Sequence, residues 1–330
     1  MRKYLIPENG KFYKAAMHIH TNLSDGKLSV EEMKQAYMDK GYSIVAFTDH
    51  EKFITHNDLT DENFIAINST EISISDSCIG YKGGWQYLPT YHLNLYAKRQ
   101  DITEKTEDML LYSVKIRDYS QHCINEIIKA CNKGGFLVCY NHPVGGLQNY
   151  KDYGELKNLW GVEWFNADCA KIGMDESMQA ADDLLRLNER VFPIAGDDAH
   201  DLGLVGKCFN MIKAEKLGYE CIMDALEKGH FYSSTGPEIY ELYIEDGLVH
   251  IKCSDVRKIA LMTERRVSFI KNAEEGTINE AVFDIKKYEE DSNLIEGNYE
   301  KAYIRITLTD KEGNLAQSVP YFLTDIKEFI

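Results

Sequence analysis

Residues 14–29 read KAAMHIHTNLSDGKLS, and in this stretch two histidines, His18 and His20, flank a single isoleucine. Residues two apart in a β-strand point to the same face, so we expect the two imidazoles side by side at the end of a short strand. Asp25 follows in a Ser-Asp-Gly turn that would bring its carboxylate nearby. The stretch therefore indicates a metal site, although a His-x-His pair alone is common.

Beyond this stretch, short apolar runs alternate with amphipathic ones. Residues 29–41 predict a helix that ends at Gly41. The start of this helix carries Ser29 as N-cap and Glu32 at the capping-box position. Residues 104–133 predict a longer helical region. Apolar strands that alternate with helices in this way predict a parallel sheet, either closed into a barrel or doubly wound.

The pattern changes near residue 237. From there to the C-terminus, runs of alternating polarity are joined by Asp-Gly and Glu-Gly-Asn turns. This pattern is typical of antiparallel β structure. We therefore expect two domains, an α/β domain over residues 1–237 and a small antiparallel, sandwich-like β domain over residues 238–330.

The composition excludes several classes of protein. The chain has 330 residues, 44% of them hydrophobic, and a net charge of −16. An acidic chain without a basic face is not expected to bind long nucleic acid. No apolar run approaches the roughly 20 residues that span a bilayer. The eight cysteines form no C-x-x-C pair, which favours buried, reduced thiols and a cytoplasmic location without membrane contact.

Further candidate ligands lie on or at the ends of the expected strands. They are His50, Glu71, His92, His142, Asp198 and His200. Because the carboxyl ends of strands in an α/β barrel meet on one face, we expect these six residues to join His18, His20 and Asp25 there. Asp49 and Asp197 neighbour this set and would either orient imidazoles or serve only the fold.

The ligand types indicate the metals. Histidine and carboxylate ligands without thiolate suit Zn, Mn or Fe. Nine candidates exceed what one ion uses, so two or three bridged ions are expected. Such a centre suits the hydrolysis of a phosphate ester, because the metals neutralise its oxygens and activate water.

The ordered motifs HIHTNLSDG, FTDH, TEIS, HLNLYA, NHP and GDDAH resemble those of the PHP family, the polymerase and histidinol phosphatase superfamily of metal-dependent phosphoesterases. The resemblance covers about residues 14–236. It implies a distorted (β/α)7 TIM-like barrel with a centre of two or three metals, and every position of the family's nine-ligand pattern is filled here. The run GHFYSSTGPE, followed by β structure, also resembles family members with a C-terminal β-sandwich.

The resemblance implies a phosphoesterase that hydrolyses a small phosphomonoester or phosphodiester, such as a nucleotide or sugar phosphate, through a metal-bound hydroxide. Asp198 or His200 would pass a proton to the leaving oxygen. Lys171, Glu163 and Asn166 are candidates for contact with the substrate, the last two either lining a pocket or capping a loop. Two alternatives stay open: metal-dependent hydrolysis of a C–N or carboxylic ester bond, and a non-catalytic metal-binding module.

Overall fold

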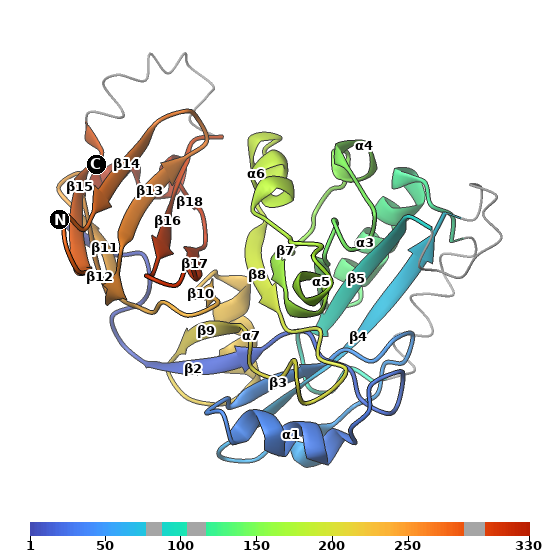
Figure 1. The fold of residues 1–330 in the computed structure, drawn as a ribbon. Coiled ribbons are helices and arrows are strands. Elements are labelled where there is room, and N and C mark those ends of the chain that lie inside the picture. The colour runs from blue at the N-terminus through green and yellow to red at the C-terminus, as the bar shows by residue number, and fades with distance from the viewer. Residues whose placement is uncertain (77–87, 104–116, 287–300) are drawn as a thin grey trace.

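The computed structural model describes residues 1–76, 88–103, 117–286 and 301–330. The strands from β2 to β10 form the part of the large sheet that carries the candidate ligands. They are β2 (Lys11–Ala16), β3 (Ile44–Phe47), β4 (Ile65–Ser75), β5 (Thr90–Ala97), β6 (Phe136–Tyr140), β7 (Gly161–Asn166), β8 (Phe192–Gly196), β9 (Phe209–Ala214) and β10 (Phe231–Ser234). The fold is mixed α/β, with a large curled sheet and short helices (Figure 1).

The described helices are mostly short. They are α1 (Val30–Met38), α3 (Gln121–Lys133), α4 (Tyr150–Tyr153), α5 (Ala167–Lys171), α6 (Gln179–Arg186), α7 (Tyr219–Glu227) and α9 (Leu323–Ile326), with 3-10 turns η1 (Asn57–Leu59) and η4 (Lys327–Phe329). Helix α3 packs on β6 and α6 packs on β7. The first part of the predicted helical region, residues 104–116, lies outside the described residues. No helix in the described ranges has the length and apolar character needed to cross a membrane.

Helix α1 confirms its predicted N-terminus. The Ser29 hydroxyl accepts the N–H of Glu32 at 3.2 Å, and the Glu32 carboxylate accepts the N–H of Ser29 at 2.8 Å. This reciprocal pair satisfies two N–H groups that have no partner within the helix. Gly41, which follows the helix, has a φ of +80°, a conformation that glycine adopts without steric cost. The start of the helix and the turn that follows it are thus set by local chemistry.

The prediction of a parallel sheet is only partly right. The strands are ordered β9-β2-β3-β4-β5-β6-β7-β8, and the pairs β2/β3, β3/β4, β6/β7 and β7/β8 are parallel. Strand β5 is antiparallel to both neighbours, and β9 is antiparallel to β2. The reversal of β5 matters for the site, because it places His92, near the start of β5, opposite Ser73, near the end of β4.

The sheet curls until the chain beyond β2 meets the chain beyond β8. Ile19 and Ala199 form a parallel bridge. The N–H of His20 donates to the carbonyl of Ala199 at 3.0 Å, and the N–H of Asp198 donates to the carbonyl of His18 at 2.9 Å. The assigned ladder of described strands is otherwise an open path. These bonds hold the two segments that carry candidate ligands side by side.

Apolar side chains from the curled sheet form one buried cluster. Ala15, Ile44, Ile65, Leu137 and Ile194, from five different strands, all belong to it. Six of the seven described cysteines are buried and none of the seven forms a disulfide, as predicted for buried thiols. Residue 78 lies outside the described residues.

The C-terminal strands form two antiparallel layers. The strands are β11 (Ile239–Glu245), β12 (Leu248–Val256), β13 (Lys258–Thr263), β14 (Ser268–Asn272), β15 (Ile278–Asp284), β16 (Tyr303–Thr309), β17 (Leu315–Ser318) and β18 (Tyr321–Phe322). One layer is β11-β12-β15 and the other is β14-β13-β16-β17, with β18 beside β16. Leu242 and Ile251 of the first layer share a hydrophobic cluster with Leu261 and Ile306 of the second.

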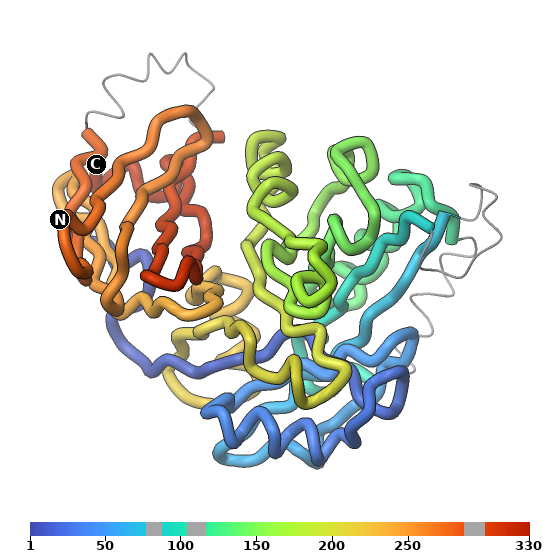
Figure 2. Tube along the Cα trace, in the orientation of Figure 1, coloured from blue at the N-terminus to red at the C-terminus, as the bar shows by residue number. Residues whose placement is uncertain are grey.

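Two pairings connect the C-terminal strands to the rest of the chain. Strand β1 (Arg2–Tyr4) pairs with β11, so the N-terminal segment lies beside the C-terminal strands (Figure 2). Strand β10 pairs with both β9 and β17, so one sheet continues across residue 237. The two-domain division at residue 237 stays a prediction.

Candidate metal centre

The structure brings the nine predicted ligands together at one edge of the curled sheet. His18 and His20 follow β2, His50 follows β3, and Glu71 lies in β4. The other four segments supply His92 from β5, His142 after β6, Asp198 and His200 after β8, and Asp25 from the loop before α1. These residues form four overlapping groups whose ligand atoms lie within 4.8 Å of one another.

The deepest part of the cluster surrounds His18 and His20, which are fully buried. Their Nε2 atoms lie 3.2 Å apart. Nε2 of His20 is 3.0 Å from Oδ1 of Asp198 and 3.3 Å from Oε2 of Glu71. Nε2 of His142 is 3.4 Å from Oε1 of Glu71. Nitrogen and oxygen atoms from four strand ends thus point at a common volume.

The outer part of the cluster surrounds Asp25, whose side chain is 54% exposed. Its carboxylate lies 3.6 Å from Nδ1 of His20, 3.6 Å from Nε2 of His50 and 3.4 Å from Nε2 of His200. His50 and His200 are partly exposed. Asp25 therefore lies at the mouth of the cluster, as the Ser-Asp-Gly turn predicted.

Glu71 connects the inner and outer parts. Its Oε2 is 3.1 Å from Nδ1 of His50, and its Oε1 is 2.9 Å from Nδ1 of His92. Oε1 also accepts a hydrogen bond from Nδ2 of Asn141 at 2.8 Å. Sequence reasoning did not single out Asn141, although its place next to His142 in the Asn-His-Pro motif is a signal for it.

Several buried atoms in the cluster lack a hydrogen-bond partner among the described residues. They are Nδ1 of His20, His50 and His142, and Oδ1 of Asp198. Buried polar atoms are nearly always satisfied, so a group of such atoms facing one another calls for an ion or ordered water. Asp198 also has a φ of +49°, a strained conformation that is common at functional sites. The donor set therefore fits divalent metal ions held by imidazole and carboxylate.

The sequence of the chain matches the model of the PHP domain family over residues 16–187, more than half of its length. The chain belongs to the PHP family. Seven of the nine candidate ligands lie within the matched range, and Asp198 and His200 lie beyond it. No curated protein matches the chain.

Solved structures with a related arrangement include a two-domain protein from Bacteroides vulgatus that contains a predicted PHP-like metal-dependent phosphoesterase. It is 14% identical, the alignment covers 97% of this chain and 98% of that one, and the TM-score is 0.48. The lesion-specific endonuclease EndoQ of Pyrococcus furiosus is 15% identical over 66% of this chain and 56% of that one, with a TM-score of 0.43. A putative metal-dependent phosphoesterase of Bifidobacterium adolescentis is 16% identical over 60% and 90%, with a TM-score of 0.37.

Charges in the PHP site are strongly coupled. Burial opposes ionisation of Glu71 and Asp198, but the neighbouring imidazoles, His18 first, hold the pKa of both carboxyls well below the usual range. Burial opposes protonation of His20, yet the carboxylates of Asp198 and Glu71, 3.0 and 3.3 Å from its Nε2, raise its pKa to about 9. The carboxylates are thus ionised and ready to accept cations, and a bound metal would replace protons on the imidazoles.

Glu163 lies beneath the histidines and is fully buried. Its Oε1 is 2.7 Å from Nδ1 of His18, and its Oε2 accepts the backbone N–H of His142 at 3.1 Å. Nδ2 of Asn166 donates to Oε2 of Glu163 at 3.1 Å and to Oδ2 of Asp198 at 3.2 Å. Oδ1 of Asn166 accepts the N–H of Cys169 and caps α5. Lys171 is exposed at the end of α5.

Asp49 and Asp197 serve the fold rather than the imidazoles. Asp49 accepts hydrogen bonds from the N–H and hydroxyl of Thr21 and from the hydroxyl of Ser24. It thereby supports the loop that carries Asp25. Asp197 accepts the Tyr37 hydroxyl at 2.8 Å and three backbone N–H groups of residues 206–208. Of the two interpretations, these hydrogen bonds favour the one in which both residues serve the fold.

Proposed function

We propose that this chain is a metal-dependent phosphoesterase that hydrolyses a small phosphomonoester or phosphodiester, such as a nucleotide or sugar phosphate. The observation that carries the proposal is the convergence of nine imidazole and carboxylate side chains, several with buried unpartnered atoms, in a PHP domain. Two or three divalent ions, Zn, Mn or Fe, suit that donor set. When bound, such ions neutralise phosphate oxygens and lower the pKa of water.

The distances suggest how the ligands are shared. His18, His20, His142 and Asp198 would hold the inner ions, and Asp25, His50, His92 and His200 would hold the outer one. Glu71 approaches members of both groups, at 3.3 Å from His20 and 3.1 Å from His50. Glu71 would therefore be a ligand that the inner and outer groups share, and its carboxylate would supply negative charge to both.

Proton transfer to the leaving oxygen needs a group near the mouth of the site. Of the two candidates, the side chain of Asp198 is only 10% exposed, whereas that of His200 is 26% exposed and lies beside Asp25. Nδ1 of His200 bonds to the carbonyl of Asp198 at 2.8 Å, so Nε2 faces the site. We therefore favour His200 over Asp198 as the proton donor. In that role Nε2 of His200 would carry the proton instead of binding metal, and Asp25, His50 and His92 would hold the outer ion.

The inner residues have a positioning role in this proposal. Glu163 and Asn166 bond to His18, to the backbone of His142 and to Asp198, so they would orient ligands rather than contact the substrate. Lys171 is exposed at the end of α5 and stays a candidate for contact with a substrate phosphate. The fold that supports them would be a distorted (β/α)7 barrel, for which the seven strands β2–β8 and the Ile19–Ala199 bridge are the support.

The test combines metal analysis with a substrate panel. The purified chain, loaded with Mn, Fe or Zn, is assayed on phosphomonoesters, cyclic phosphates and phosphodiesters, with carboxylic esters and amides in the same panel. We expect turnover of a phosphate ester that depends on metal. His20→Ala and Asp25→Asn should lose turnover and bound metal, whereas His122→Ala, an exposed change on α3, should keep both.

Three results would contradict the proposal. Turnover of amides or carboxylic esters alone would change the reaction class. Stoichiometric metal without any turnover would favour a non-catalytic module. Full metal content and activity in both His20→Ala and Asp25→Asn would mean that the site is misplaced. Asp25→Asn guards against misfolding, because Asp25 is largely exposed whereas His20 is buried.

A further inference from the structure

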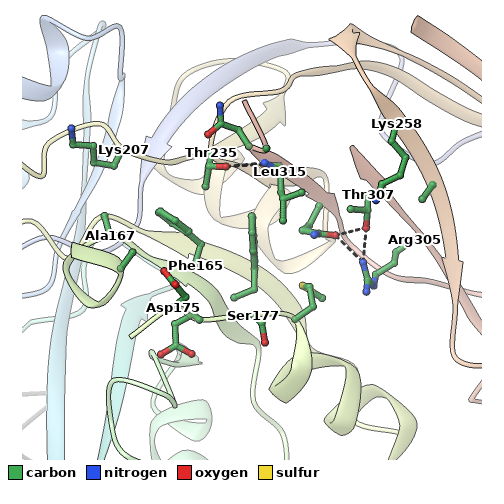
Figure 3. A pocket seen from close by; sticks show the side chains of 18 of the residues that line it. Phe165, Ala167, Asp175, Ser177, Lys207, Thr235, Lys258, Arg305, Thr307 and Leu315 are labelled. Carbon is green, nitrogen blue, oxygen red and sulfur yellow. Dashed lines mark hydrogen bonds between the residues drawn. The ribbon is translucent and has the colours of Figure 1, made fainter. Parts of the chain in front are cut away.

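A cavity of about 1140 Å³ separates β7, α5 and the start of α6 from the C-terminal strands β13, β14, β16 and β17 (Figure 3). None of the nine candidate metal ligands is among the described residues that line it. Cavities of several hundred cubic ångströms with a largely apolar lining and a few polar groups are typical of small-molecule sites. The cavity is therefore a candidate site that the metal centre does not explain.

Strand β7 shows that the cavity and the metal centre are different sites. Glu163 faces the metal centre, where it bonds to His18. Trp164, the next residue, lines the cavity, and its Nε1 donates to the hydroxyl of Ser233 at 2.7 Å. Phe165 lines the cavity as well, because the register of β7 shifts between Glu163 and Phe165. The cavity is therefore lined by other residues of β7 than the one that supports the candidate ligands.

The opposite wall is one face of the C-terminal sheet. In β13, Lys258, Ala260 and Met262 line the cavity, whereas Ile259 and Leu261 belong to the hydrophobic cluster that the two C-terminal layers share. The same alternation places Arg305 and Thr307 of β16 on the cavity side. One face of this sheet thus packs in the hydrophobic core, and the other face lines the cavity. Phe165 of β7, Met178 before α6 and Leu315 of β17 add apolar surface to the lining.

Positive charge in the cavity wall is only partly neutralised. Arg305 is paired with Asp182, with Nη2 and Oδ2 2.9 Å apart, and its Nη1 donates to Thr307 and Gln317. Lys258 makes no ion pair within the described residues, and its side chain points toward Thr307 (Figure 3). These hydrogen bonds hold Thr307 and Arg305 in place, so the polar side chains near Lys258 are fixed. An anion beside Lys258 would meet a fixed positive surface.

Two acidic residues, Asp175 and Glu176, also line the cavity. Asp175 is exposed. Burial raises the pKa of Glu176 to about 7, so its carboxyl is often protonated near neutral pH. Its Oε1 accepts the N–H of Gly145 at 2.9 Å, and its Oε2 has no hydrogen-bond partner among the described residues. Glu176 therefore repels an anion less than an exposed glutamate would.

We propose that this cavity is a second ligand site, which binds a small organic anion with a flat apolar body. The body would pack between Phe165 and Leu315, and the anionic group would lie beside Lys258. Lys207, at the other side of the cavity, would attract the anion from solution. The proposal does not depend on the chemistry of the metal centre.

The probe is 8-anilinonaphthalene-1-sulfonate, an aromatic sulfonate that fluoresces when it is shielded from water. It is titrated into the full chain, with and without metal. We expect one saturable site in both forms. N-phenyl-1-naphthylamine, which has the same rings without the sulfonate, should bind about tenfold more weakly, because one charge-assisted contact corresponds to about 1.4 kcal/mol or more.

Two variants test separately the charge of Lys258 and the free volume of the cavity. Lys258→Ala should raise the Kd of the sulfonate about tenfold, and Ser268→Trp, a change of an exposed residue in β14 that fills the cavity, should abolish binding. Lys216→Ala, at an exposed lysine that does not line the cavity, is the matched control and should leave the Kd unchanged. Asp25→Asn at the metal centre should also leave it unchanged.

The proposal is overturned by any of four results. These are the absence of saturable binding, equal binding of the charged and uncharged probes, an unchanged Kd in both Lys258→Ala and Ser268→Trp, and loss of binding in Asp25→Asn. Light scattering adds a fifth: a dimer that Ser268→Trp dissociates, with no probe bound, would mean that a second copy of the chain covers the cavity. Thermal melting of each variant checks that the chain has folded.

Discussion

Oε1 of Glu163 lies 2.7 Å from Nδ1 of His18, and both side chains are fully buried. This contact turns Nε2 of His18 toward Oε2 of Glu71 and Oδ1 of Asp198, each 3.4 Å away. A carboxylate that accepts a hydrogen bond from Nδ1 fixes the tautomer of an imidazole and makes Nε2 a stronger ligand. In the proposed site, Glu163 would therefore prepare His18 to bind a metal ion through Nε2.

Glu163→Gln should weaken metal binding while the chain stays folded. A glutamine amide keeps the size of the side chain but loses the negative charge that supports His18. Loss of such a partner typically lowers metal affinity by about 10–100-fold. Titration with Mn or Zn against a competing chelator measures the change. Glu126→Gln, the same change of charge on α3, should have no effect, and an equal affinity in both variants would show that Glu163 does not tune His18.

Divalent metal should stabilise the chain against unfolding. The folded site gathers ionised carboxylates and imidazoles with unpartnered buried atoms, whereas the unfolded chain offers no assembled site. A metal at about 100 times its Kd should add about 2.7 kcal/mol to the free energy of unfolding. Thermal melts with Mn or Zn and with a chelator test this.

Asp198→Asn should remove most of the stabilisation, because it takes away a buried carboxylate of the inner group. The exposed change His122→Ala should leave the shift intact. If the chelator leaves the melting temperature of the parent chain unchanged, the cluster does not bind metal strongly.

The positions of the candidate ligands could be predicted because all of them except Asp25, which lies in the loop before α1, are on or beside a strand that has a clear local signature. His18 and His20 follow an apolar run, and His50 ends another. Because strand ends meet on one edge of a curled sheet, the order of the strands along the chain was enough to predict that these residues lie close together. Helix α1 was equally accessible, since its capping box depends only on Ser29 and Glu32.

Other features could not be predicted because they depend on contacts between distant parts of the chain. An apolar run indicates a strand but not the direction of its neighbours, so the antiparallel placement of β5 was missed. The role of Asp197 depends on Tyr37 and on the loop at residues 206–208. The pairing of β1 with β11 joins the first residues to the last strands, and nothing local in Arg2–Tyr4 specifies that partner.

Asp182→Ala should destabilise the chain strongly. Asp182, on α6, makes two contacts with the guanidinium of Arg305, at 2.9 and 3.2 Å, and accepts the Tyr303 hydroxyl at 3.1 Å. The side chain of Arg305 is only 5% exposed. Removal of one partner leaves a buried charge unpaired, which typically costs about 3–5 kcal/mol. Urea unfolding measures the loss.

The double variant Asp182→Leu with Arg305→Met tests whether such a loss of stability comes from the unpaired guanidinium of Arg305. If the cost of Asp182→Ala comes from the unpaired guanidinium, the double variant should recover much of the stability, because no buried charge remains. Asp183→Ala, a change of the neighbouring residue on α6, is the matched control. Equal stability of Asp182→Ala and the control would mean that the ion pair does not hold α6 to β16.

Glu176 should make stability depend on pH. Burial, in addition to the nearby Glu163, raises the pKa of Glu176 from 4.5 to about 7, against the opposing effects of the Gly145 and Val144 N–H groups and of His142. The folded chain therefore holds a proton that the unfolded chain releases between these two values. The resulting contribution to stability is present below pH 4.5 and is lost as the pH rises through 7, by at most about 3 kcal/mol.

Glu176→Gln removes this titration and keeps a carbonyl oxygen that can accept the N–H of Gly145. The free energy of unfolding of the chelator-treated chain is measured from pH 5 to pH 8, so that metal binding does not contribute. The parent chain should lose stability relative to Glu176→Gln across this range, and the difference should level off above pH 7. A constant difference between the two chains from pH 5 to pH 8 would show that Glu176 titrates at its ordinary pKa. The comparison isolates one carboxyl, since every other titrating group is shared by both chains.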